Sequence, residues 1–511
     1  MSPHFRDCAL ALGALALIGL AASSKRMNGR VSRPSIGLRM LAQSFAAPRG
    51  AGGARWAGVN DCRSLAVSAP CKGRLAMGRS GRHLLAAEPG QSIAVIGPTQ
   101  TGKTSGFAVP AILEWEGPVL ATSVKTDLTR DTMGWRSNLG EVAVFDPACV
   151  TGAKGASWSP LDSCATWPDA RRTAASLTDL ARDRGSGLAD GEFWYSMAAK
   201  LLSPLLFAAA ASGRCMGDVI RWLDDQEEAE VAEVLCSTGV EEALRAARAS
   251  WSREERQRSS VYATAESVLE VFADPELAAM GGGSASRLRT SFKVTESSGV
   301  TSRVDPASLV SGGSGTIYVC APAHEQHRLQ PVFATLVRSV LRTAFERAMR
   351  KGKPLDPPLL VVLDEAANIA PLPELDVLAS TACGHGIQLV TIWQDLAQIT
   401  SRYGPRASTV VNNHRAKVFL SGISDPSTLE HASQLIGEAD APVRSSTRAG
   451  GGQRSSTTST APRRLLAADA LRRIRPGEGV LIYGCLPPAR LQLRPWFAER
   501  SLLHRCNSSC G

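Results

Sequence analysis

The segment Gly97–Thr104, which reads Gly-Pro-Thr-Gln-Thr-Gly-Lys-Thr, constrains the fold of this 511-residue chain more than any other feature. It matches G-x-x-x-x-G-K-[ST], a P-loop, in which the backbone of a tight turn surrounds phosphate oxygens. The apolar run 91–96 before it predicts a buried strand, and a helix is expected from Lys103 towards Glu114. A strand, this loop and a helix in that order predict a nucleotide site on a parallel α/β sheet.

The residues of this loop have distinct expected roles. Backbone N–H groups and the positive end of the following helix should hold the phosphates of ATP or GTP. Lys103 should contact the β- and γ-phosphates, and the Thr104 hydroxyl should ligate Mg²⁺. The residues expected to bind nucleotide are Gly97, Pro98, Thr99, Gln100, Thr101, Gly102, Lys103 and Thr104.

Two adjacent acids end a second apolar run, Leu359–Leu363. At the carboxyl end of that strand, Asp364 is expected to hold Mg²⁺, usually through water, and Glu365 to act as general base on the attacking water. Strands often end in acids, so the pair gains its meaning from the P-loop, with which it predicts hydrolysis. Gln394 ends the run 387–393, where an amide suits sensing of the γ-phosphate or orientation of water; a solvated strand end is the alternative.

Two further strand ends carry charged residues. Lys125 and Asp127 follow the expected strand 117–124, and Asp146 follows the expected strand 141–145. Ligands bind at this edge of open α/β sheets, which favours a role at the site. An ion pair between Lys125 and Asp127 that only fixes the loop is an equally good interpretation.

Helical patterns replace strands over residues 165–300. The apolar stretch 193–211 is long enough to suggest a membrane span, but Lys200 near its middle favours a buried core helix. Strands return at 315–321, 358–364, 387–393, 416–421, 479–485 and 489–493. This order predicts an α/β nucleotide-binding domain in two parts, 59–164 and 301–500, with an all-alpha domain at 165–300 inserted between them and a tail at 501–511. Residues 447–462, rich in Gly, Ser and Thr, are expected to form a flexible loop.

A short apolar run at residues 8–22 lies near the N-terminus. It is shorter than the roughly 20 residues of a spanning helix, and its length also fits a signal peptide. Basic residues follow it closely while only Arg6 precedes it, which by the positive-inside rule keeps the body of the chain in the cytoplasm. We therefore expect a membrane anchor at 1–24 and a basic linker at 25–58.

The amino-acid composition gives weaker information about binding partners than the motifs give about the nucleotide site. The net charge of +10 and pI near 9.2 suit an anionic partner such as nucleic acid or a membrane surface. Only 10 of the 57 basic residues are Lys, however, and a GC-rich genome produces the same Arg bias. None of the 12 cysteines forms a Cys-x-x-Cys pair, so zinc is not expected, and scattered thiols indicate a reduced, cytosolic protein.

A set of short motifs in a fixed order resembles the type IV secretion coupling proteins of the TraG/TraD conjugative DNA-transfer family, in their actinobacterial form. The motifs are the P-loop, Ser-Val-Lys-Thr-Asp from Ser123, Val-Phe-Asp-Pro ending at Pro147, Trp-Ser-Pro-Leu from Trp158, Asp-Glu-Ala-Ala-Asn from Asp364, and Ile-Trp-Gln-Asp ending at Asp395. The resemblance covers about residues 55–500. The P-loop is generic, whereas the ordered set with its helical insertion is specific.

The resemblance implies a RecA-like ATPase core, a TraM-recognition-like region within 301–500, and a ring, expected to be a homo-hexamer, at the cytoplasmic side of the inner membrane. It also implies ATP and Mg²⁺ as cofactors, and single-stranded DNA, a relaxase and the secretion channel as partners. Two departures stand out: the chain has one short apolar run where relatives usually have two membrane helices, and Ala-Cys383-Gly-His385-Gly stands where an Arg finger is expected. Arg415 is the nearest basic alternative.

Three functions remain open on the sequence. The first is a motor that hydrolyses ATP to pump DNA into the secretion channel. The second is a related FtsK-like or secretion motor that moves double-stranded DNA or protein, which would share Lys103, Asp364 and Glu365. The third is a platform that binds nucleotide and recruits substrates without turnover, which the missing Arg finger favours and Glu365 opposes.

Overall fold

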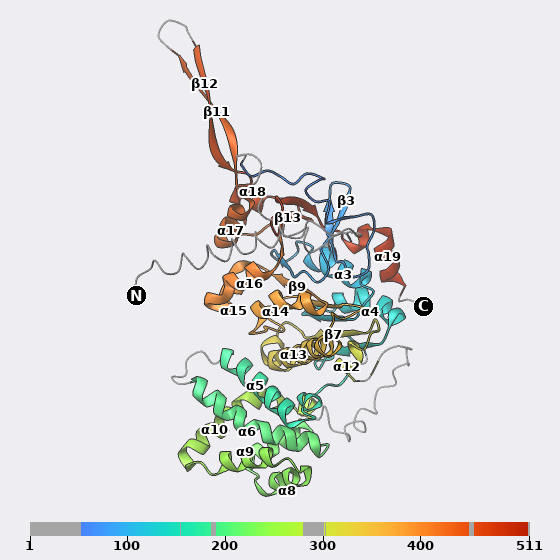
Figure 1. The fold of residues 1–511 in the computed structure, drawn as a ribbon, viewed down its shortest axis with the longest axis vertical. Helices are drawn as coiled ribbons and strands as arrows, with labels where there is room; N and C mark the ends of the chain where they lie inside the picture. Colours follow the sequence, from blue (N-terminus) through green and yellow to red (C-terminus); the bar gives the residue numbers. More distant parts are fainter. Residues whose placement is uncertain are drawn as a thin grey trace, which may run out of the picture. The chain divides into compact units, whose positions relative to one another are not determined.

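A twelve-stranded sheet forms the centre of the fold in the computed structural model, which describes residues 53–153, 155–184, 191–278, 301, 303–448 and 454–508 (Figure 1). The expected anchor and most of the basic linker lie outside these ranges. From one edge to the other the strands are β1 (Ala66–Val67), β3 (His83–Ala86), β2 (Ala76–Ser80), β14 (Ala489–Gln492), β13 (Glu478–Tyr483), β10 (Ala416–Leu420), β4 (Ile93–Ile96), β9 (Ile387–Trp393), β8 (Leu359–Leu363), β5 (Val119–Ser123), β7 (Thr316–Cys320) and β6 (Val142–Phe145).

The sheet is parallel where the nucleotide motifs lie and antiparallel at one side. The seven strands from β10 to β6 pair in parallel, and the others add antiparallel meander pairs beyond β10. Parallel strands have their carboxyl ends at one edge. The β4–β9 and β8–β9 registers, Ile96 opposite Trp393 and Leu363 opposite Thr391, therefore bring the three motif-bearing loops together.

Both faces of the sheet are covered, because successive strand side chains point to opposite sides. In β8, Leu360 and Val362 pack with the core that contains Phe107 and Ile112, and Val361 packs with the core that contains Phe333. The first face is covered by the helical segment η2 (Thr104–Ala108) with α3 (Val109–Glu114) and by α4 (Asp127–Leu139). The second contacts α13 (Gln326–Lys351), α14 (Leu375–Thr381), η6 (Ala382–His385), α15 (Leu396–Tyr403), α16 (Ala407–Asn413), α17 (Pro426–Ile436) and α18 (Ala468–Arg472).

Apart from one isolated β-bridge between Ser157 and Arg303, the regular elements described between β6 and β7 are all helices. After η3 (Pro160–Ser163) the chain forms α5 (Trp167–Arg184), α6 (Gly191–Ala211), α7 (Met216–Asp224), α8 (Ala229–Thr238), α9 (Glu241–Trp251), α10 (Glu255–Leu269), η4 (Glu270–Ala273) and α11 (Pro275–Ala278), followed by α12 (Pro306–Leu309). Among the described residues α6 alone is long and apolar enough to cross a membrane. It packs against α5, α8, α9 and α10 with 61% of its apolar window buried, as a core helix does.

Residues 449–453 lie outside the described residues, and residues 447–448 and 454–462 do not form the expected flexible loop. They belong to an antiparallel hairpin, β11 (Glu438–Arg448) and β12 (Arg454–Arg464), paired from Glu438–Arg464 to Arg448–Arg454 and projecting beyond the body of the fold (Figure 1). The expectation was wrong because it used low apolar content alone. Thr favours extended backbone, and a hairpin exposed on both faces has no apolar alternation to reveal it.

The last described residues form a helix rather than a separate tail. After η8 (Trp496–Ala498), α19 (Arg500–Asn507) buries Leu502 against Val109 and Leu113 of α3. A buried ion network fixes this junction: Arg494 donates to Glu114 at 2.7 Å and to Glu499 at 2.6 Å. Arg505 of the same helix also donates to the Leu113 carbonyl at 2.7 Å and stacks on Trp135 at 5.1 Å. The polar composition of this segment gave no sign of these few contacts.

Arg136 of α4 ties the amino ends of β5 and β7 together. It is fully buried, and its guanidinium donates to the carbonyls of Trp115, Gly117 and Ser314 and to Thr316 Oγ1. Burial lowers its pKa to about 10, so the group stays charged at neutral pH. A planar guanidinium with five donors can satisfy more strand-entry carbonyls at once than the three donors of a Lys ammonium can.

Candidate nucleotide site

The P-loop connects β4 to the helix that begins at Thr104. Gln100 and Gly102 both have positive φ, 64° and 88°, which curls the loop back on itself. A Cβ on Gly97 would lie 2.8 Å from Leu420 Cβ, so only glycine fits between β4 and β10. Thr101 Oγ1 donates to Pro98 O at 2.9 Å and closes the turn. The local sequence thus supplies the curled backbone that a phosphate cradle needs.

Lys103 points into this loop. Its Nζ donates to Gly97 O, and to Pro98 O at 3.1 Å, and the residue is 9% exposed. Burial lowers its pKa, while Asp364 and Glu365 act in the opposite direction. A buried ammonium inside the curl is positioned to exchange these carbonyl contacts for phosphate oxygens.

The two expected magnesium ligands meet. Thr104 Oγ1 donates to Asp364 Oδ2 at 3.0 Å, across loops that are far apart in sequence. Burial raises the pKa of Asp364 to about 6, although the Thr104 hydrogen bond acts against this rise. Hard oxygen ligands at this spacing fit Mg²⁺, which is usually held by one or two protein oxygens together with phosphates and water. The described residues contain no cluster of three or more His, Cys, Asp or Glu for any other metal.

Glu365 follows in a strained conformation. Its φ is +55°, uncommon for a residue with a side chain, and such strain persists where the surroundings enforce it. Asn368 Nδ2 donates to Glu365 Oε2 at 3.2 Å, and the Asn368 carbonyl accepts from Gln330 of α13 at 2.9 Å. The sequence analysis assigned no role to Asn368. The segment Asp-Glu-Ala-Ala-Asn could have indicated one, because residues three positions apart, here Glu365 and Asn368, meet in a turn.

Gln394 lies beside the P-loop. Gly97 N donates to Trp393 O at 3.1 Å, so the residue after β9 flanks the first loop glycine. Its own N–H donates to Gln398 Oε1 at 2.9 Å, which fixes the backbone there. The half-buried side chain is thus carried at the same edge as Asp364, and its role in sensing phosphate stays a prediction.

Asp127 is near this site, and Asp146 has a structural role. The Asp127 carboxylate raises the pKa of Asp364, and its Oδ1 is buried without a partner among the described residues. No ion pair joins it to Lys125, which is exposed and lies close enough to Lys103 to help lower its pKa. Asp146 Oδ2 instead accepts from the Thr151 N–H and hydroxyl at 2.7 Å each, which fixes its own loop.

Arg415 lies away from the P-loop of its own chain. It precedes β10, so it is at the amino edge, where it pairs with Glu88 at 3.6 Å and stacks on Tyr483 at 5.7 Å. Cys383 accepts from Gln91 at the same edge. Neither segment therefore supplies a cation to the site within one chain.

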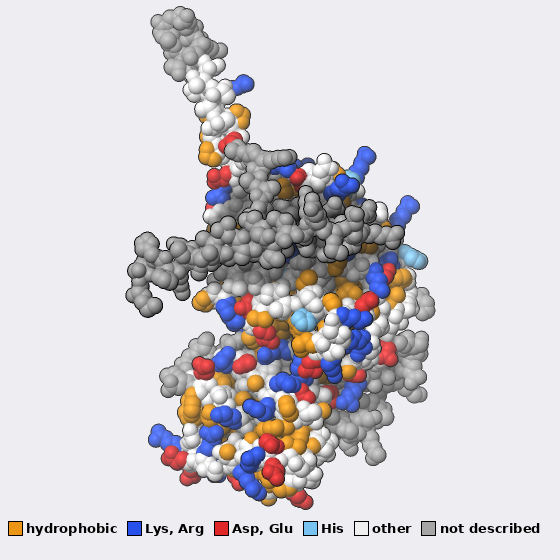
Figure 2. Space-filling view, viewed as in Figure 1, with side chains coloured by type: hydrophobic (Ala, Val, Ile, Leu, Met, Phe, Trp, Pro, Cys, Tyr) orange, Lys and Arg blue, Asp and Glu red, His pale blue; other side chains and the backbone are white. Residues whose placement is uncertain are grey.

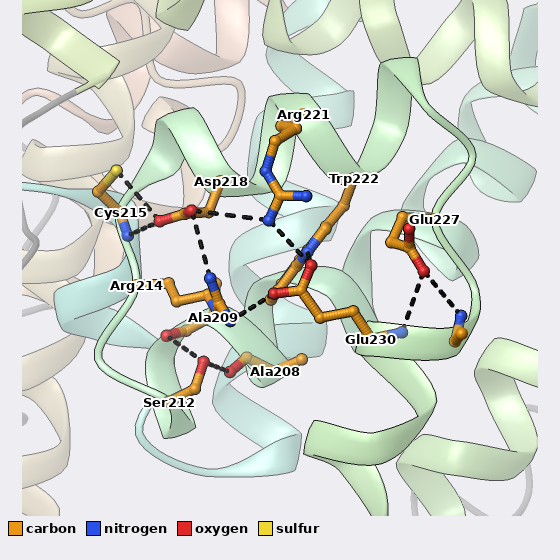
Figure 3. Close-up of polar contacts among 11 residues, drawn as sticks. Ala208, Ala209, Ser212, Arg214, Cys215, Asp218, Arg221, Trp222, Glu227 and Glu230 are labelled. Atoms are coloured by element: carbon orange, nitrogen blue, oxygen red, sulfur yellow. Dashed lines mark hydrogen bonds and ion pairs between the residues drawn. The ribbon is translucent and has the colours of Figure 1, made fainter.

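A second polar cluster lies in the helical insertion and serves packing (Figure 3). Glu230 accepts from Trp222 Nε1 at 2.8 Å and Arg221 at 2.9 Å and pairs with Arg214, so α8 is joined to α7 and the turn before it. The Trp222 and Arg221 hydrogen bonds lower the pKa of Glu230. Arg214 also stacks on Trp222 at 5.3 Å. Because these charges face one another, the cluster explains helix docking rather than ligand binding.

Comparison with known families gives two matches to separate stretches of the chain. Residues 59–294 match the family described as type IV secretory system conjugative DNA transfer, and residues 358–476 match the TraM recognition site of TraD and TraG. The conjugal transfer protein TraG of Escherichia coli is 26% identical over 67% of this chain and 54% of its own length. Protein VirD4 of Rhizobium radiobacter is 22% identical over 83% and 59%. The chain thus spans about half the length of the curated relatives it matches.

Solved structures agree on the fold. The plasmid coupling protein TrwB, in complex with ADP and Mg²⁺, superposes with a TM-score of 0.63 at 17% identity, covering 88% of this chain and 95% of that chain. The predicted fold class, a RecA-like P-loop ATPase core of the α/β class, is therefore confirmed. The predicted family resemblance is confirmed by the two matched stretches.

Proposed function

This chain belongs to the type IV secretory conjugative DNA-transfer family, and from that premise we propose that it is a coupling ATPase that recruits a relaxase-bound DNA strand and pumps it into the secretion channel. The observation that carries the proposal is the meeting of Lys103, Thr104, Asp364 and Glu365 at one sheet edge, with Asp364 Oδ2 3.0 Å from Thr104 Oγ1. A nucleotide-binding scaffold alone would not need a general base. The neighbouring base therefore favours turnover.

The residues divide the chemistry between them. ATP with Mg²⁺, when bound, supplies the phosphoanhydride bond whose hydrolysis drives movement. Lys103 and the loop N–H groups hold the phosphates, and Thr104 and Asp364 hold the metal. Glu365 takes a proton from the attacking water on its carboxylate, while Asn368 orients that carboxylate through Oε2. Gln394, beside Gly97, orients the water or senses the γ-phosphate.

The partners follow from the family and from the charge of the chain. We propose single-stranded DNA, a relaxase and secretion-channel components as partners, with the chain at the cytoplasmic side of the inner membrane, anchored by residues 8–22, and assembled as a homo-hexamer. The visible face carries Lys and Arg interspersed with Asp and Glu (Figure 2), which does not suggest a large basic patch there. A ring needs only a few basic residues per subunit in its channel, since six subunits multiply the phosphate contacts.

The test is the steady-state ATPase rate against both single-stranded DNA and enzyme concentration. DNA should accelerate hydrolysis, and activity per subunit should rise with concentration if each site borrows a cation, such as Arg415, from its neighbour. DNA binding should weaken steeply with salt and ignore sequence. A rate per subunit that is flat in both variables would favour the recruitment platform. If only double-stranded DNA or only protein stimulates ATP hydrolysis, the result would favour an FtsK-like or protein-secretion motor.

The anchor is tested separately by fractionation. The intact chain should sediment with membranes, whereas a chain that starts near Arg55 should be soluble. Equal solubility of the two would remove the anchor and leave the ATPase proposal standing.

A further inference from the structure

We propose that Gln330 of α13 is a positioning residue, which holds the general base Glu365 in its working orientation through Asn368. The proposal rests on the proposed function, because only a chain that hydrolyses ATP has a base to position. Gln330 lies 38 positions before Asn368 and in none of the motifs that mark the nucleotide site. The inference therefore adds to the site a residue from a different element of the fold.

Glu365 and Asn368 are the two ends of a tight turn after β8, here named the catalytic turn (residues 365–368). Asn368 N donates to Glu365 O at 2.9 Å and closes the turn, while Asn368 Nδ2 donates to Glu365 Oε2 at 3.2 Å. The φ of Glu365 is +55°, a conformation that a residue with a side chain does not favour by itself. Contacts from outside must therefore hold the catalytic turn in this shape.

The catalytic turn is hydrogen-bonded to two other elements, one at each end. Near its start, Ala366 N donates to Ile392 O of β9 at 3.2 Å. At its end, Gln330 Nε2 donates to Asn368 O at 2.9 Å. The first contact joins two backbones and survives any side-chain substitution. The second depends on the amide of Gln330, so a change at this residue should release one end of the turn alone.

Burial makes the Gln330 contact hard to replace. Gln330 is 7% exposed, and the atom that faces the Asn368 carbonyl must be its amide nitrogen, because a carbonyl only accepts hydrogen bonds. A carbonyl that loses its donor inside a protein leaves a polar group unsatisfied. The end of the catalytic turn should then move until the Asn368 carbonyl finds another donor, and the Asn368 side chain should move with it.

The helix that carries Gln330 is a firm support. Phe333 of α13 packs in the core on one face of the sheet. On the side of the helical insertion, Arg338 donates to Ser176 Oγ at 2.9 Å, and the hydroxyls of Ser339 and Ser163 are 2.7 Å apart. A side chain on a helix that is held on two sides keeps its position better than one on a loop. The position of Asn368 is therefore set by α13.

The consequence for hydrolysis is geometric. A general base must lie within hydrogen-bond reach of the water that it deprotonates. With Oε2 of Glu365 held by Asn368, the carboxylate keeps one orientation between turnovers. Loss of the Gln330 amide should let this carboxylate rotate away from the water, which lowers kcat. Nucleotide binding should not change, because Lys103 and Thr104 belong to the other loop.

The experiment measures kcat and KM for ATP, binding of a fluorescent ATP analogue and the urea midpoint of the full-length protein. Gln330→Met keeps the length of the side chain and removes its donor. It should lower kcat about five- to tenfold, the rate equivalent of one hydrogen bond, with KM and analogue affinity unchanged. Gln330→Asn keeps the amide but withdraws it by one methylene, so it should act in the same way and serves if Gln330→Met does not fold.

Ser339→Ala is the matched control. Ser339 lies on the same helix with the same 7% exposure and loses its hydrogen bond to Ser163, away from the catalytic turn. This variant should keep the parent kcat even if its urea midpoint falls. A second test uses the Asn368→Ala background, in which Gln330→Met should lower kcat by less than about twofold, because the side chain through which Gln330 acts is gone.

Three results would overturn the proposal. They are the parent kcat in a folded Gln330→Met or Gln330→Asn protein, an equal loss of kcat in Ser339→Ala, and a full five- to tenfold loss in the Asn368→Ala background. The first would leave Gln330 as a donor that serves stability alone. A parent protein without ATP hydrolysis would refute the proposed function, and the positioning role with it. Normal turnover in the parent with any of the three results would refute the positioning role only.

Discussion

Thr104 Oγ1 and Asp364 Oδ2 lie 3.0 Å apart although 260 positions separate them in the chain. One comes from the helix after β4 and the other from the end of β8, with β9 between these strands. The register of three parallel strands sets their separation. The two proposed magnesium ligands are therefore positioned by the sheet and not by any local turn.

This pair predicts a specific pH dependence. Burial raises the pKa of Asp364 from 3.8 to about 6, so between these values the folded protein holds a proton that the unfolded chain has released. Without Mg²⁺, the free energy of unfolding should fall by up to about 3 kcal/mol as pH rises from about 4 to about 6, and then level off. Because other carboxyl groups with shifted pKa values, such as Asp162, also titrate in this range, the difference in urea unfolding between the parent and Asp364→Asn measures this contribution. Mg²⁺ affinity should fall below about pH 6, because protons compete for the same oxygen.

Lys103→Ala should abolish nucleotide binding or turnover, because we propose the side chain that projects into the loop as the main cationic contact for phosphate. Equilibrium binding of a fluorescent ATP analogue and the ATPase rate report on it. Lys72→Ala is a matched control, since Lys72 is exposed and distant from the loop, with only a 3.8 Å contact to Asp356. Retained turnover in Lys103→Ala would assign the phosphate contact to another residue.

Glu365→Gln should leave nucleotide binding intact and slow hydrolysis by about 10² or more, the usual scale for loss of a general base. Asn368→Ala should lower kcat by less and leave KM unchanged, because it removes only the donor to Glu365 Oε2. Steady-state kinetics of both variants separate the two roles. Normal kcat in Asn368→Ala would show that the contact at 3.2 Å does not position the base.

Arg136→Met should destabilise the fold by roughly 3 kcal/mol or more, because the carbonyls of Trp115, Gly117 and Ser314 would be buried without donors. Loss of the buried charge offsets only part of this cost. Urea midpoints measure the change, with exposed Arg171→Met as the control, expected within about 0.5 kcal/mol of the parent. Equal midpoints for both variants would mean that water replaces the guanidinium.

The sequence alone determined the parts whose signals are local. The P-loop pattern names its residues, and apolar runs that end in Asp364 or Gln394 mark strand ends. Because carboxyl ends of parallel strands share an edge, secondary structure alone placed these residues at one edge of the sheet. Their contact depends on the strand order β4-β9-β8, which only the tertiary structure gives. The helical insertion was equally visible, since its segments lack strand patterns.

Only the tertiary structure decided the contacts that depend on unusual backbone or on distant partners. The contact of Asn368 with Glu365 requires φ of +55° at Glu365, which no residue pattern specifies. Among the described side chains of β11 and β12 none is buried, so the pairing of these strands left no apolar alternation to detect. The C-terminal helix docks through one buried leucine, Leu502, and through Arg505, which donates to the Leu113 carbonyl and stacks on Trp135, too few positions for a periodic pattern. Hydrophobic periodicity in a sequence indicates which positions are buried, so it reveals helices and strands that face the core. It does not reveal contacts that depend on strained backbone, on pairing of exposed strands or on a single side chain.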